Sequence, residues 1–171
     1  MNSGKNIPVV SVAGDKNSGK TSLIEQLVST LKRDGYGVVG VIKYARRDIQ
    51  IDHEGKDTYR FYESGADAVY IASPAKMAFI RRIESPPPLD EVLGTYFPFA
   101  DVVFLEGYRE GGCPKIHLVA PGKEHGESEQ APHDKGSPVL RINVSGQSNP
   151  ISQEVLHKAL EFVRHVMKGT C

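Results

Sequence analysis

The stretch GDKNSGKT, residues 14–21, places two glycines, a lysine and a threonine at the spacing GxxxxGKT. This spacing suits phosphate binding. Glycines let backbone N–H groups approach phosphate oxygens, the lysine supplies charge, and the threonine hydroxyl can ligate Mg²⁺. The sequence therefore predicts a nucleotide-binding loop made of Gly14, Asp15, Lys16, Asn17, Ser18, Gly19, Lys20, Thr21 and Ser22.

The segments on either side of this loop match what a phosphate site requires. The anion cradle needs a strand before the loop and a helix N-terminus after it. Residues 7–13 form a short β-branched apolar run, typical of a buried parallel strand. Apolar residues then recur at helical spacing from Leu23 to Leu31, and Gly35 is expected to end that helix. This context favours a phosphate site over a glycine-rich turn that only joins a strand to a helix.

A site for a magnesium nucleotide also needs an acid at the tip of a neighbouring strand. Glu106 follows four apolar residues and precedes Gly107. Carboxyl ends of parallel strands share one edge of a sheet, so we predict that Glu106 serves catalysis there and holds Mg²⁺ with Thr21. The alternative is an ordinary carboxylate at a strand end.

A second candidate catalytic acid lies in the segment that would reach over the phosphates. Asp48, Asp52 and Asp57 all occur there, and one of them could position a water or add a metal ligand. Asp52 is the residue that we select, although a solvated loop carboxylate is equally compatible with each of the three.

Strand and helix patterns alternate along the chain. Strands are also predicted at 38–44, 68–73, 77–83, 101–107, 115–120 and 138–144, and helices at 55–65, at 89–97 and after a Ser152 cap. The helix at 89–97 is expected to bury Leu89, Val92, Leu93 and Tyr96. We predict an α/β fold of the P-loop NTPase type, with a mainly parallel β-sheet flanked by helices on both faces.

Composition limits the class of protein. The 171 residues carry 21 basic and 21 acidic side chains, so no global field favours nucleic acid or an anionic membrane. Apolar runs of strand length predict no membrane span, and the lack of a signal layout predicts a cytoplasmic protein. We expect a single nucleotide-binding domain over residues 1–171, with a mobile polar loop at 121–137.

Three blocks of the sequence resemble the MobB family of molybdopterin-guanine dinucleotide biosynthesis proteins in order and spacing. They are GDKNSGKTSL at 14–23, IKYARRDIQIDHEGKDTYRFYESGA at 42–66 and DVVFLEGYREGGCPKIHL at 101–118. The resemblance implies a homodimeric adapter that binds GTP and Mg²⁺ and hydrolyses GTP weakly. It also implies a molybdenum cofactor guanylyltransferase as partner, and it suggests the molybdenum insertion protein and molybdopterin as further ones.

By position, the resemblance matches Asp52 and Lys56 to the family's middle block and Lys115, a candidate phosphate contact, to its third block. This chain has Arg46 and Arg47 where family members commonly carry histidines. Adjacent guanidinium groups suggest a clamp for phosphate or cofactor, with a solvated basic loop as the alternative.

One alternative function stays open, a P-loop small-molecule kinase or ATP-dependent ligase. A kinase would need an arginine-rich lid, and the segment RRIESPPP is too rich in proline to form a convincing one.

Overall fold

The computed structural model describes residues 7–119, 136–144 and 151–169. The chain divides into two compact units. The larger unit contains the chain up to Tyr44 and from Val92 onward, and the smaller unit is Ala45–Glu91. Whether the two behave as the predicted single domain stays a prediction. Residues 121–135, most of the loop predicted to be mobile, lie outside the described residues.

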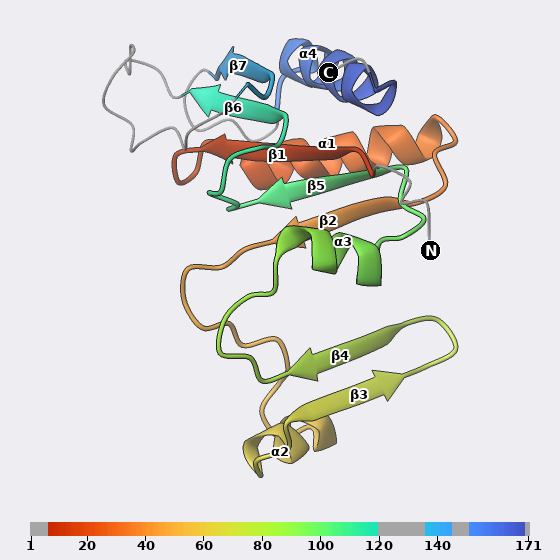
Figure 1. Ribbon diagram of the computed structural model, residues 1–171, viewed down its shortest axis with the longest axis vertical. Helices are drawn as coiled ribbons and strands as arrows, with labels where there is room; N and C mark the ends of the chain where they lie inside the picture. Colours follow the sequence, from red (N-terminus) through yellow and green to blue (C-terminus); the bar gives the residue numbers. More distant parts are fainter. Residues whose placement is uncertain (1–6, 120–135, 145–150, 170–171) are drawn as a thin grey trace. The chain divides into compact units, whose positions relative to one another are not determined.

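The larger unit is built on a five-stranded parallel sheet in the order β2-β5-β1-β6-β7 (Figure 1). Its strands are β1 Val9–Gly14, β2 Val39–Lys43, β5 Val102–Glu106, β6 Lys115–Val119 and β7 Val139–Asn143. The central strand β1 pairs in parallel with β5 on one side and with β6 on the other. This confirms the predicted α/β class, and it brings the carboxyl ends of all five strands to one edge.

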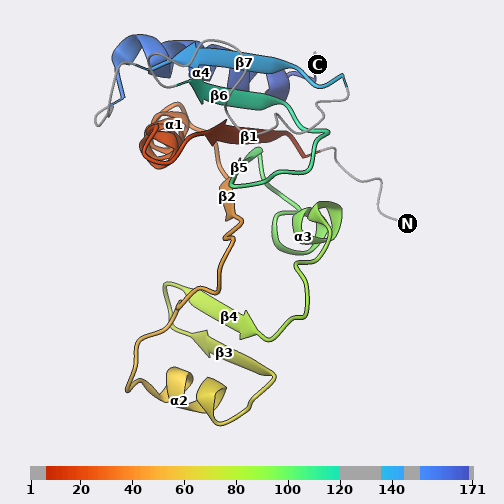
Figure 2. The same cartoon turned by 90° about the vertical axis from the view of Figure 1, so that its left-hand side faces the viewer.

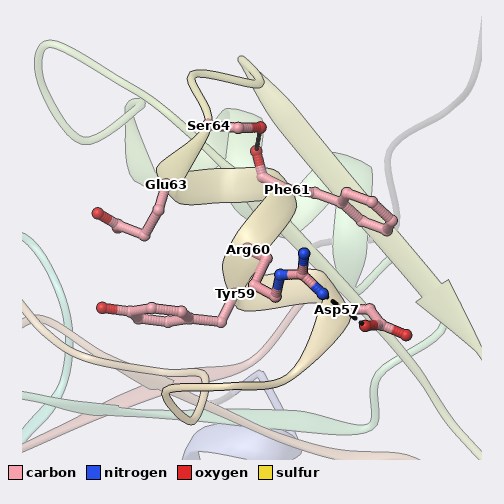
Figure 3. A pocket seen from close by; sticks show the side chains of 6 residues that line it. All are labelled: Asp57, Tyr59, Arg60, Phe61, Glu63 and Ser64. Carbon is pink, nitrogen blue, oxygen red and sulfur yellow. Dashed lines mark hydrogen bonds and ion pairs between the residues drawn. The ribbon is translucent and has the colours of Figure 1, made fainter.

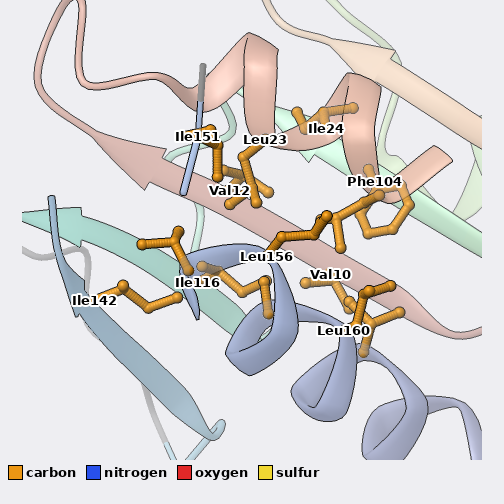
Figure 4. Packing of buried hydrophobic residues seen from close by; sticks show 14 of the residues in the cluster. Val10, Val12, Leu23, Ile24, Phe104, Ile116, Ile142, Ile151, Leu156 and Leu160 are labelled. Atoms are coloured by element: carbon orange, nitrogen blue, oxygen red, sulfur yellow. The ribbon is translucent and has the colours of Figure 1, made fainter. Parts of the chain in front are cut away.

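Two helices, α1 (Lys20–Arg33) and α4 (Gln153–Met167), cover one face of this sheet. Their apolar stripes meet the strands in a single core, and Figure 4 shows the packing of Val10, Val12, Leu23, Ile24, Phe104, Ile116, Ile142, Ile151, Leu156 and Leu160. The predicted cap of α4 is present, since the Ser152 hydroxyl accepts a hydrogen bond of 3.3 Å from the Val155 N–H.

The opposite face of the sheet is covered at β5 and β2. Val103 and Leu105 alternate with the core residues of β5 and are fully buried on that second face. The helix α3 (Leu89–Tyr96) leads into Phe97, whose ring lies over Gly40 so closely that a Cβ there would be 2.6 Å away. Gly40 therefore makes room for an aromatic ring on this face.

The predicted apolar stripe of α3 is only partly confirmed. Leu93 is buried as predicted, Leu89 and Val92 are half-buried, and the prediction for Tyr96 is wrong because this side chain is 60% exposed. The helix ends at Tyr96, and the next residue, Phe97, turns onto the sheet in its place.

The smaller unit is a hairpin with one short helix (Figure 2). Strands β3 (Ala68–Ala72) and β4 (Met77–Arg81) pair in antiparallel fashion and form a sheet of their own, which the strand patterns did not predict. Arg82 joins the hairpin to α2 (Asp57–Glu63), because its guanidinium lies 4.0 Å from the centre of the Tyr62 ring. None of the α2 side chains is buried, so this unit has little core of its own.

Truncating the core beneath the loop tests this packing. Leu27 of α1 is fully buried, so Leu27→Ala should lower the free energy of unfolding by about 2–5 kcal/mol through lost burial and a residual cavity. Urea denaturation measures the change, with Glu25→Ala on the exposed side of the same helix as the control. Equal stability of the two variants would contradict the packing of α1.

Candidate functional site

The loop from β1 to α1 folds tightly through backbone conformations that favour glycine. Gly14, Asn17 and Gly19 have positive φ angles of 144°, 64° and 88°. A Cβ on Gly14 would lie 2.6 Å from the Leu118 carbonyl oxygen and 2.7 Å from the Ser18 Oγ. The first glycine of the motif is therefore required by both the backbone angle and the space.

Lys20, the first residue of α1, is folded back onto this loop. Its Nζ donates hydrogen bonds to the carbonyl oxygens of Gly14, at 3.0 Å, and Asp15. Burial lowers the pKa of Lys20, while the nearby carboxylates of Glu106 and Asp15 act in the opposite direction. The loop thus holds an ammonium group at its centre.

Thr21 and Glu106 meet across the edge of the sheet. The Thr21 Oγ1 lies 3.2 Å from each carboxylate oxygen of Glu106, which it reaches as a hydrogen-bond donor. Glu106 ends β5 and is only 13% exposed at its side chain. The structure therefore brings together two residues that the sequence analysis paired, 85 positions apart.

Lys43 is a member of this group that the sequence analysis missed. Its Nζ lies 3.4 Å from the Glu106 Oε1, and its side chain is 63% exposed. Lys43 ends β2 directly opposite Glu106 in the parallel pairing. The sequence signal that could have found it is a charged residue at the end of a predicted strand, but the pairing of β2 with β5 is needed to use that signal.

The Thr21–Glu106 pair fits a magnesium ion by its chemistry. A hydroxyl and a carboxylate are hard oxygen ligands, and Mg²⁺ in nucleotide sites takes one or two such groups together with phosphate oxygens and water. Among the described residues, no group of three or more His, Cys, Asp and Glu side chains could hold a metal ion. Mg²⁺ at this edge would take its remaining ligands from phosphate oxygens and water.

Comparison with known proteins identifies the family. The model of the family described as "Molybdopterin guanine dinucleotide synthesis protein B", MobB, matches residues 9–138. The chain belongs to the MobB family. It is 34% identical over 113 residues to the molybdopterin-guanine dinucleotide biosynthesis adapter protein of Haemophilus influenzae. This match covers 66% of this chain and 63% of that protein, so the chain spans less than two thirds of that relative. The adapter protein of Escherichia coli is 29% identical over 126 residues, with 72% of this chain and 71% of that protein covered.

Solved structures agree with this assignment. A crystal structure of molybdopterin-guanine biosynthesis protein B superposes with a TM-score of 0.64 at 27% identity, covering 94% of this chain and 99% of that one. The structure of Bacillus subtilis MobB, at 18% identity, has a TM-score of 0.58 over 91% of this chain and 97% of its own and supports the fold alone. No described helix of this MobB-family chain is both long and apolar enough to span a membrane.

Other predicted residues of this MobB-family chain lie in the smaller unit, which is described by itself. Asp52 is engaged locally, because its Oδ1 accepts a hydrogen bond of 2.8 Å from the His53 N–H. The Thr58 side chain and this N–H lower the pKa of Asp52. Arg46, Arg47 and Lys56 belong to the same unit. Their roles, and that of Asp52, stay predictions.

Lys115 lies in the larger unit, and in the pairing of β6 with β1 it is Leu118, not Lys115, that lies opposite Gly14 of the loop. It begins β6, opposite Ser11, and is only 4% exposed. Its predicted phosphate contact also stays a prediction.

A shallow hollow on α2 does not form a second candidate site. Figure 3 shows its lining side chains, Asp57, Tyr59, Arg60, Phe61, Glu63 and Ser64. Asp57 and Arg60 pair with each other at 3.9 Å, and the Ser64 hydroxyl donates to the Phe61 carbonyl. All six residues come from one helix and its cap, so the hollow brings no distant groups together.

Adding one methyl group to the loop tests its geometry. Gly14→Ala should lower the free energy of unfolding more than Gly35→Ala, by at least about 1 kcal/mol, because only the Gly14 methyl meets backbone and side-chain atoms. Both glycines have positive φ, so the second variant controls for backbone strain. Urea denaturation of both variants gives the difference, and a cost no greater for Gly14→Ala would contradict the described loop.

Proposed function

We propose that this chain is a GTP-binding adapter protein of molybdopterin guanine dinucleotide biosynthesis that acts with Mg²⁺ and hydrolyses GTP slowly. The observation that carries the proposal is the Thr21 hydroxyl against the Glu106 carboxylate, beside a lysine held in a glycine loop. The name adapter protein, which the relatives bear, supports the biological role.

Each part of the site has a proposed task. The N–H groups of the loop and of the α1 N-terminus bind phosphate oxygens, and Lys20 exchanges its carbonyl partners for phosphate. Thr21 and Glu106 hold Mg²⁺, which supplies charge neutralisation at the phosphates. Asp52 is the proposed water-positioning residue.

The proposed partner is the guanylyltransferase that attaches GMP to molybdopterin. The molybdenum insertion protein is a further proposed partner, since an adapter must contact the proteins that it serves. Arg46, Arg47, Lys56 and Lys115 are the proposed contacts for phosphate groups of GTP or molybdopterin, because guanidinium and ammonium groups bind such anions.

A nucleotide-binding measurement tests the proposal. Titration calorimetry in the presence of Mg²⁺ should show tighter binding of GTP than of ATP. Lys20→Ala should weaken GTP binding roughly tenfold to a hundredfold, because a charge-assisted contact to phosphate is lost. Lys158→Ala, on the exposed side of α4, is the control.

Two outcomes would contradict this proposal. Equal or tighter binding of ATP removes the GTP adapter and leaves the kinase or ligase alternative. Unchanged GTP affinity in Lys20→Ala would mean that the loop does not hold the phosphates.

We also propose that the chain forms a homodimer through the hairpin. Val69 of β3 is buried, and strand alternation places Tyr70 on the other face of the hairpin, together with its cross-strand partner Phe79 and with Met77. These three side chains are 60%, 46% and 61% exposed. An isolated two-stranded hairpin is marginal in water, and a second copy of the same apolar face would supply the missing cover.

A charge on this face tests the dimer. Phe79→Glu should yield a monomer, because it places a carboxylate in an apolar contact, whereas Ala75→Glu in the exposed hairpin turn should leave the dimer intact. Sedimentation velocity distinguishes the two. A dimer in both variants would show that this face is not the interface.

A further inference from the structure

Lys43 lies at the metal end of the proposed nucleotide site. It is the last residue of β2, and Glu106 is the last residue of the adjacent parallel strand β5. Adjacent parallel strands end at the same edge of the sheet, so the last side chains of β2 and β5 lie next to each other there. The 3.4 Å between Lys43 Nζ and Glu106 Oε1 is the result.

The two members of this ion pair differ in exposure. The Lys43 side chain is 63% exposed and the Glu106 side chain is 13% exposed, so water screens the lysine more than the carboxylate. Glu106 also already receives the Thr21 hydroxyl at both of its oxygens. Lys43 is therefore an exposed cation beside a more enclosed carboxylate.

The charge around Glu106 favours an additional anion. Lys43 is close enough to Lys20 to disfavour its charged form, so two ammonium groups share the neighbourhood of the Glu106 carboxylate. If Mg²⁺ neutralises that carboxylate, the Lys43 ammonium loses its counterion. Thr21 and Glu106 would hold the metal, which would supply charge neutralisation at the phosphates, and Lys43 would then be available to bind a phosphate oxygen of the same nucleotide.

We propose that Lys43 is a second phosphate-binding lysine, which contacts the terminal phosphate and makes the site prefer a nucleoside triphosphate to a diphosphate. This inference rests on the proposed nucleotide-binding function. It separates the tasks of the two lysines. Lys20 serves any nucleotide phosphates in the loop, whereas Lys43 responds to the phosphate that is present only before hydrolysis.

The ratio of two affinities tests the proposal. Dissociation constants for a non-hydrolysable GTP analogue and for GDP, both with Mg²⁺, are measured by titration calorimetry on the full chain. Lys43→Met should weaken analogue binding about tenfold or more and leave GDP binding within about twofold. Lys43→Arg should restore most of the preference, since it retains the positive charge, and Lys158→Met is the matched control on α4.

A merely structural role for Lys43 gives a different pattern. If the lysine only positions Glu106, Lys43→Met weakens both nucleotides equally, and the proposal is overturned. An unchanged ratio with unchanged affinities overturns it as well. The melting temperature of Lys43→Met should match that of the wild type, which excludes loss of fold as the cause.

The same experiment separates this inference from the proposed function. The same dissociation constants are then measured for ADP and a non-hydrolysable ATP analogue. They show whether Lys43 sets the preference for triphosphate over diphosphate if the protein binds adenine nucleotides instead of guanine nucleotides. If the wild type binds no nucleotide of either kind, both proposals fall. If it binds them and Lys43→Met leaves the ratio unchanged, only the role of Lys43 falls.

Discussion

The parallel pairing of β1 with β5 is the constraint on which the candidate site depends. This pairing sets Val12 opposite Glu106, two residues before the loop begins at Gly14. The acid and the loop therefore emerge at one edge of the sheet, and the first turn of α1 carries Thr21 back to the carboxylate. A shift of one residue in this pairing would turn Glu106 to the opposite face, because side chains alternate along a strand.

The core beneath the loop makes that arrangement stiff. Leu23 and Leu27 of α1 are fully buried against the sheet. Their packing fixes the distance between β1 and the helix that begins at Lys20. The loop spans this fixed gap with three residues at positive φ, Gly14, Asn17 and Gly19. Tight packing of α1 thus fixes the position at which this loop enters the helix.

Local patterns in the sequence predicted the parts of the site that depend on neighbours along the chain. The loop, the helix after it and Glu106 at a strand tip all follow from short motifs with a known geometry. Lys43 did not, because its contact requires knowing that β2 lies beside β5. The hairpin was missed for the same reason: its strands have ordinary strand patterns, and nothing in those patterns says that they pair only with each other. The prediction for Tyr96 was wrong because the helix ends at that residue, and the ring that packs against the sheet belongs to the next residue, Phe97.

The division of the chain separates the proposed phosphate and metal ligands from the proposed water-positioning residue. On the proposed roles, phosphate and metal are held by Lys20, Thr21 and Glu106, all in the larger unit. The proposed water-positioning residue, Asp52, lies in the smaller unit and is engaged by Thr58. On these roles, the phosphate and metal contacts are complete within the larger unit and require no residue of the smaller one.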